Sequence, residues 1–63
     1  MITRTIYVPA NALGRYVLEN IWDVVSCSMG EIKKVGSTLA VPVTMPEREI
    51  VKVERILQMF DLL

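Results

Sequence analysis

The sequence contains no histidine and only one cysteine, Cys27, among its 63 residues. A single thiol cannot form a disulfide within the chain, and without imidazole it cannot complete a usual zinc site. A nucleophilic cysteine also needs a neighbouring base, and histidine, which usually supplies it, is absent from this sequence. We therefore expect no enzymatic activity, no cofactor and no metal centre, and we interpret Cys27 as a small inert residue.

The sequence also lacks an excess of charge and any long apolar run. Seven basic and seven acidic residues give a formal net charge of zero, so no overall field attracts nucleic acid or a membrane surface. No apolar run approaches the ~20 residues that a membrane helix needs. Residues 1–6 show no signal-peptide core. With a free thiol, these features lead us to expect a cytoplasmic protein without membrane contact.

What the chain has in abundance is apolar side chains, which make up 52% of its residues. Residues 1–63 are expected to form one small domain, and a domain of this size has a thin margin of stability. Small domains usually gain stability from disulfides, a metal or a second subunit. Because the first two are not expected here, the apolar surplus predicts a homodimer or a protein partner.

The stretch Asn11–Val25 organises the chain as an amphipathic helix, with Asn11 as its N-cap. Its apolar arc covers about 180°, whereas a core-facing stripe needs little more than ~100°. We assign the core stripe to Leu13, Val17, Ile21 and Val24. The remaining apolar residues, Leu18, Trp22 and Val25, are left to contact something else.

Three segments have strand patterns. Residues 2–8 alternate, with Ile2, Arg4, Ile6 and Val8 on one face and Thr3, Thr5 and Tyr7 on the other. Residues 31–35 and 38–43 form a hairpin around Gly36-Ser37, a pair that suits a type II′ turn. The resulting register places Lys33 opposite Ala40, Ile32 opposite Val41 and Glu31 opposite Pro42, so that Ile32 would lie on the core face. The missing N–H of Pro42 then faces residues 31–35.

A second helix follows Thr44-Met45-Pro46-Glu47, a sequence typical of a capping box. Its core stripe is expected to be Ile50, Val53, Ile56, Leu57 and Phe60. Its other sides carry Val51, Met59 and Leu62 and a basic strip, Arg48, Lys52 and Arg55.

The expected order is therefore β-α-β-β-α, a small two-layer α+β sandwich. A right-handed crossover makes residues 2–8 parallel to residues 31–35, and residues 38–43 fit between them. Both helices then cover one face of a three-stranded sheet. This order is similar to a ferredoxin-like fold without its last strand, a likeness of element order only, which does not imply a function.

Among functions, we favour a non-enzymatic protein–protein interaction or regulatory module that associates with itself. The interface candidates are Thr3, Thr5, Tyr7, Leu18, Trp22, Val51, Met59 and Leu62. Either the sheet face or the outer edge of residues 2–8 could form the contact. The first alternative is a small nucleic-acid-binding or transcription-regulatory protein that uses Lys33, Arg48, Lys52 and Arg55. The second is a small-ligand-sensing regulatory module, for which the sequence shows no convergent polar groups.

Overall fold

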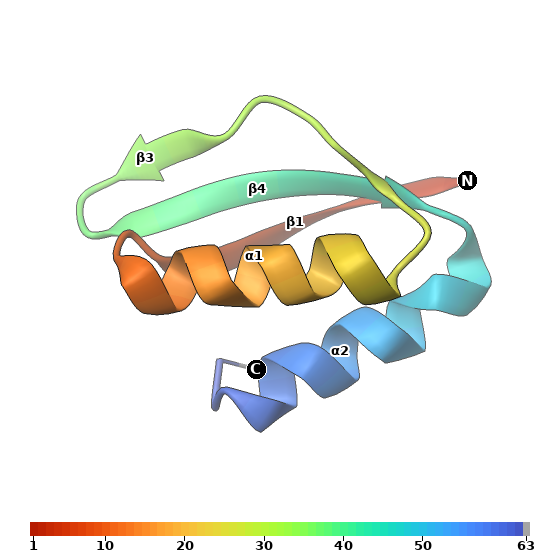
Figure 1. Cartoon of the computed structure of the whole chain (residues 1–63). Coiled ribbons are helices and arrows are strands. Elements are labelled where there is room, and N and C mark those ends of the chain that lie inside the picture. The colour runs from red at the N-terminus through yellow and green to blue at the C-terminus, as the bar shows by residue number, and fades with distance from the viewer. Residues whose placement is uncertain (63) are drawn as a thin grey trace.

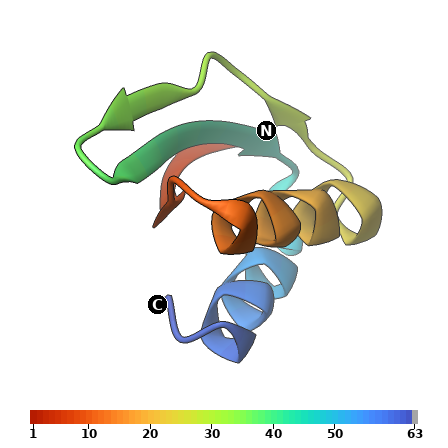
Figure 2. The same ribbon diagram turned by 60° about the vertical axis from the view of Figure 1, so that its left-hand side comes forward.

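The computed structural model describes residues 1–62 and has the expected α+β arrangement, with an antiparallel sheet and two helices (Figure 1). The strands are β1 (Ile2–Pro9), β2 (Ser28–Met29), β3 (Lys33–Val35) and β4 (Thr38–Met45). The helices are α1 (Ala12–Val24), the short 3-10 turn η1 (Glu47–Glu49) and α2 (Ile50–Met59). Figures 1 and 2 show both helices on the same side of the sheet.

Strand β4 is the centre of the sheet. It pairs along its whole length with β1 on one side, and with β2 and β3 on the other. The prediction that the second strand of the hairpin lies between the other two is therefore confirmed. The sheet has four strands rather than three because the outer column is divided into β2 and β3.

The hairpin follows the predicted register only near its turn. Lys33 pairs with Ala40 and Val35 with Thr38, as expected, and Gly36 has a φ of 62°, as the first central residue of a type II′ turn requires. Beyond Lys33 the register shifts by one residue, because Met29 pairs with Val43.

The predicted pairs of Ile32 with Val41 and Glu31 with Pro42 are therefore wrong. Ile32 lies in the extra length between β2 and β3 and is exposed rather than in the core. The residue opposite Pro42 is Gly30, whose N–H donates to the Pro42 carbonyl over 2.8 Å. The missing N–H of Pro42 does face this outer column, and the column breaks directly after Gly30. The one-residue bulge turns Met29 onto the helical side of the sheet.

Helix α1 begins at the predicted cap: the Asn11 side chain accepts a hydrogen bond from the Gly14 N–H over 3.2 Å. Gly14 then brings the helix directly against β1, because a Cβ at this position would overlap the Pro9 carbonyl oxygen. This contact decides which side of the helix faces the sheet.

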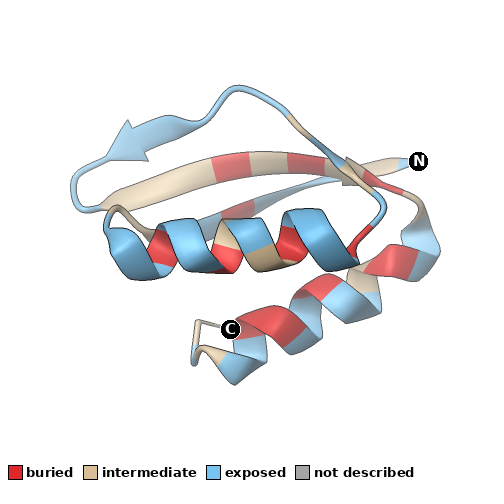
Figure 3. Ribbon diagram, viewed as in Figure 1, coloured by how far each residue is buried: buried red, intermediate tan, exposed pale blue. Residues whose placement is uncertain are grey.

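The core stripe of α1 consequently differs from the predicted one. Val17 and Ile21 are fully buried as expected, whereas Leu13 and Val24 are exposed and Val25 is buried. In the first turn of α1 the buried residue is Gly14 rather than Leu13. Figure 3 shows the buried positions of α1 in red, between exposed positions along the helix.

Helix α2 does not begin with a capping box. Thr44 and Met45 belong to β4, Pro46 precedes η1, and the helix start has no side-chain cap. Because β4 continues past Val43, Met45 becomes one of the most deeply buried side chains, which the capping assignment overlooked. The predicted core stripe of α2 is confirmed for Val53, Ile56 and Leu57, with Ile50 and Phe60 partly buried against the core.

We expect Gly14→Ala to destabilise the fold by at least about 2 kcal/mol, because the new methyl group must displace either β1 or α1. The higher helix propensity of alanine, about 1 kcal/mol, opposes this effect and does not cancel it. Thermal and urea unfolding measure the difference. The neighbouring exposed substitution Arg15→Ala is the control and should stay within about 0.5 kcal/mol of the parent. A Gly14→Ala variant as stable as that control would contradict the close approach.

Candidate interaction surface

The outer edge of β1 presents unpaired backbone groups. The N–H and C=O of one residue in an antiparallel strand point to the same side, and the side alternates along the chain. Pro42 directs its carbonyl toward Gly30, so its cross-strand neighbour in β1, Thr5, directs its own groups away from β4. By alternation Thr3 and Tyr7 do the same. These three residues are the ones that the sequence predicts for the strand edge.

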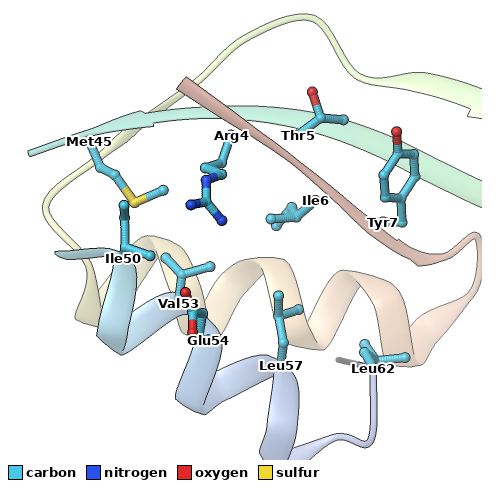
Figure 4. Close-up of a pocket in the computed structure, with 10 residues that line it drawn as sticks. All are labelled: Arg4, Thr5, Ile6, Tyr7, Met45, Ile50, Val53, Glu54, Leu57 and Leu62. Atoms are coloured by element: carbon cyan, nitrogen blue, oxygen red, sulfur yellow. The ribbon is translucent and has the colours of Figure 1, made fainter. Parts of the chain in front are cut away.

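A groove lies beneath this edge, between β1 and α2, and we call it the edge groove (Figure 4). Its volume is about 160 Å³. Its walls are formed by Arg4, Thr5, Ile6 and Tyr7 from β1, by Met45, and by Ile50, Val53, Glu54, Leu57 and Leu62. A dry cavity of about 150 Å³ accepts a group the size of benzene, so the edge groove has room for one large apolar side chain.

The C-terminal end of α2 closes one end of the edge groove. Asp61 adopts a left-handed conformation with a φ of 59°, and the Leu62 N–H donates to the Leu57 carbonyl over 2.8 Å. The Asp61 N–H donates to the Gln58 carbonyl over 3.0 Å. These two bonds form a Schellman motif, in which the residue after the left-handed position folds back on the last turn. Leu62 is thereby placed beside Leu57 in the groove wall.

Charges also border the edge groove. Arg4 comes from the helical side of β1 and Glu54 from α2, and Figure 4 shows both side chains in the space between the two elements. Arg4 is exposed, so its charged head stays in water although the sequence pattern places the residue on the same face as the core residues Ile6 and Val8. Within residues 1–62, no carboxylate lies within 4.0 Å of its guanidinium group.

The predicted interface residues are distributed over several surfaces. Leu62 lines the edge groove together with Thr5 and Tyr7, two residues of the strand that forms its upper wall and whose side chains point away from α2 in Figure 4. Leu18 and Trp22 line a second groove on the opposite side of α1, and Val51 and Met59 are exposed on α2. Thr3 lies on the open face of the sheet, where its hydroxyl shares a 2.8 Å hydrogen bond with that of Thr44.

The basic residues of the nucleic-acid alternative do not form one surface. Lys33 shares the open sheet face with Tyr7, since both residues oppose Ala40 from its two sides. Arg48, Lys52 and Arg55 instead lie on the helical side of the molecule. Lys52 is also engaged, because its Nζ lies 3.0 Å from Oε2 of Glu49. This separation leaves no continuous basic track for a nucleic-acid backbone among these four residues.

The surroundings of Cys27 weaken it as a nucleophile. Burial, and secondarily the negative charge of Glu49, raise the pKa of the Cys27 thiol above its ordinary value. Glu49 is itself buried, and its Oε2 is close enough to Lys52 for an ion pair but not well directed for a hydrogen bond. A carboxylate that disfavours the thiolate cannot activate the cysteine by its field.

Several residues of these surfaces were missed by sequence reasoning. Ile50 and Glu54 line the edge groove, although the pattern assigned Ile50 to the core and gave Glu54 no role. Met29 and Ile32 line the second groove with Glu19 and Asp23. A signal for Ile50 was present, since it begins the apolar stripe of α2. No local signal marks Ile32, whose position depends on the bulge before β3.

No protein-family model, curated protein or solved structure matches the chain. Among residues 1–62, no three histidine, cysteine or acidic side chains are placed to hold a metal ion. The same residues include no helix with the length and apolar character needed to cross a membrane.

We expect Cys27 to react with iodoacetamide more slowly than a free thiol at pH 8, because its raised pKa keeps it protonated. The reaction rate of the folded protein should rise with pH. The pH at which it reaches half its maximum should be higher than for the same chain in denaturant. Folded-state protonation also makes stability fall as the pH rises through this titration, an effect that Cys27→Ser removes. A midpoint at or below the denatured value would contradict the assignment.

Proposed function

We propose that this chain is a non-enzymatic protein–protein interaction module that associates with a second copy of itself through the free edge of β1. The observation that carries the proposal is the row of outward backbone groups at Thr3, Thr5 and Tyr7, directly above the edge groove. An unpaired strand edge is a template for another strand. Here the edge is long, because β1 contains eight residues.

A two-fold axis through Thr5 gives the best antiparallel pairing of two β1 strands. Thr5 then exchanges both backbone hydrogen bonds with Thr5 of the second copy, and Thr3 pairs with Tyr7. An axis through Arg4 would bring two like charges face to face, which destabilises a cross-strand pair. An axis through Ile6 would set Thr3 against Pro9, which has no N–H to donate. Thr5 is therefore the centre at which all three outward residues are paired.

The apolar residues beside the edge add to this pairing. Tyr7 is 62% exposed, and burying a large side chain contributes about 1.5–3 kcal/mol. The added strand also covers part of the edge groove, whose walls include Ile6, Leu57 and Leu62. For a domain that has only one free cysteine and no metal cluster within residues 1–62, a second subunit is the remaining source of extra stability.

The non-enzymatic part of the proposal is supported by the raised pKa of the Cys27 thiol and by a sequence that contains no histidine to act as its base. A cytoplasmic location, expected from the free thiol, is part of the same proposal. The edge groove offers apolar walls with only Arg4 and Glu54 as charged groups, which suits a strand-borne side chain better than a polar small ligand.

We expect Thr5→Pro to dissociate the dimer. Proline removes the one N–H at the centre of the free edge, and it leaves the bonds between β1 and β4 intact because Thr5 does not donate to β4. At a salt concentration high enough to screen contacts between surface charges, sedimentation equilibrium at micromolar concentration should show a monomer of 7.1 kDa for this variant and twice that mass for the parent.

Thr5→Val is the matched control, since it keeps the N–H and the β-branched shape and should remain dimeric. Far-UV circular dichroism establishes that Thr5→Pro is still folded. A monomeric parent, or a Thr5→Pro variant that dimerises like the parent, would overturn the proposal. A monomeric parent that binds an extended apolar peptide at this edge would replace the second copy with another protein.

A further inference from the structure

A second groove, separate from the edge groove, lies between α1 and the segment that joins β2 to β3. We call it the Trp22 groove, and its volume is about 440 Å³. It is lined by four apolar residues and two acidic ones, namely Leu18, Glu19, Trp22, Asp23, Met29 and Ile32. Trp22 is 57% exposed although it is the largest side chain of the molecule. No lysine or arginine lines this groove.

The acidic side chains of the Trp22 groove have no ionic partner in the described chain. Glu19 and Asp23 are both exposed on α1, and no basic group of residues 1–62 lies within 4.0 Å of either carboxylate. Arg15, four residues before Glu19, is spaced for an ion pair with it, but no such pair forms within residues 1–62. The groove therefore combines an apolar floor with an uncompensated negative rim.

The same chain displays a complementary surface on α2, which we call the outer face of α2. At 100° per residue, Val51, Arg55 and Met59 lie together on the side of α2 opposite the buried Val53, Ile56 and Leu57. Arg48, in the 3-10 turn η1 directly before α2, extends this side at about 120° per residue. Val51 is 58% and Met59 78% exposed. Arg48 and Arg55 have no carboxylate of residues 1–62 within 4.0 Å. This surface combines apolar side chains with an uncompensated positive charge.

We propose that the Trp22 groove of one copy receives the outer face of α2 of a second copy. Opposite charges then meet at the rim, where Arg48 and Arg55 approach Glu19 and Asp23, and an arginine over the Trp22 ring gains a cation–π contact. Val51 and Met59, about 12 Å apart along the helix axis, lie on the apolar floor. Met and Trp are both enriched at such contacts.

This contact is head-to-tail rather than two-fold. The Trp22 groove lies on the side of α1 turned toward Ile32. Tyr16, on the other side of α1, packs edge-to-face on Phe60 at the end of α2, with the two ring centroids 5.6 Å apart. One copy can therefore offer its groove to one neighbour and its helix to another. The contact does not use the β1 edge, so it holds or fails independently of the proposed dimer.

Charge reversal tests the proposal in the full chain. The groove variant is Glu19→Lys/Asp23→Lys and the helix variant is Arg48→Glu/Arg55→Glu. Both are made in the parent and in the Thr5→Pro chain, so that loss of the edge contact is measured separately. In the Thr5→Pro chain at low salt, some association should persist. Each variant alone should weaken this association, and sedimentation velocity should give a dissociation constant at least tenfold higher. That association should also weaken as salt is added.

An equimolar mixture of the two variants should associate again, because the reversed groove now attracts the reversed helix. In that mixture Trp22 emission should shift to shorter wavelength as the indole is buried. The control Glu47→Lys/Glu54→Lys, made in the Thr5→Pro chain, causes the same change in net charge as the groove variant at exposed positions that belong to neither surface, and it should leave the association unchanged.

Three results would overturn the proposal: variants that associate like the parent, a mixture that stays monomeric while each variant is folded, or an effect of the groove variant without any effect of the helix variant. The last result would assign the groove to a basic segment of a different protein.

Discussion

The antiparallel ladder between β1 and β4 is the constraint on which the rest of the structure depends. It runs through eight consecutive pairs, from Ile2 with Met45 to Pro9 with Thr38. Because side chains alternate along a strand, this one register places the valines and isoleucine of both strands beneath the helices, and a slip of one residue would turn the threonines inward. The same alternation points every second amide of β1 away from β4. The ladder that forms the core therefore also forms the free edge.

Local sequence rules predicted the elements whose determinants are adjacent in the chain. The Asn11 cap, the Gly36-Ser37 turn and the buried stripe of α2 each depend on a few neighbouring residues, and each is present. The errors arise where distant residues meet. The rotation of α1 is set by the contact of Gly14 with Pro9, which a helical wheel does not contain. The register shift before β3 depends on the hydrogen bond from the Gly30 N–H to the Pro42 carbonyl. The hairpin pattern does not contain this contact, so it favoured an uninterrupted strand.

The candidate surface was predictable to the same extent. Alternation in residues 2–8 identified the edge residues, and the excess apolar arc of α1 identified Trp22. The grooves themselves could not be derived, since each has walls from elements far apart in sequence. The edge groove joins β1 to Leu62, whose position depends on the left-handed Asp61. The Trp22 groove needs Ile32, which is exposed only because the bulge removes it from the sheet.

A net charge of zero describes this molecule incompletely, because its charges are separated in space. Acidic groups border the Trp22 groove and basic groups lie on the outer face of α2, so the proposed contact would bring opposite charges together although the chain has no overall field. The two proposed contacts differ in physical character. Backbone pairing at β1 is short-ranged and insensitive to salt, whereas the contact at Trp22 depends on exposed charges that salt screens. An assembly that used both would change its size with ionic strength without losing its dimers, and a chain this small would gain stability from each step by mass action.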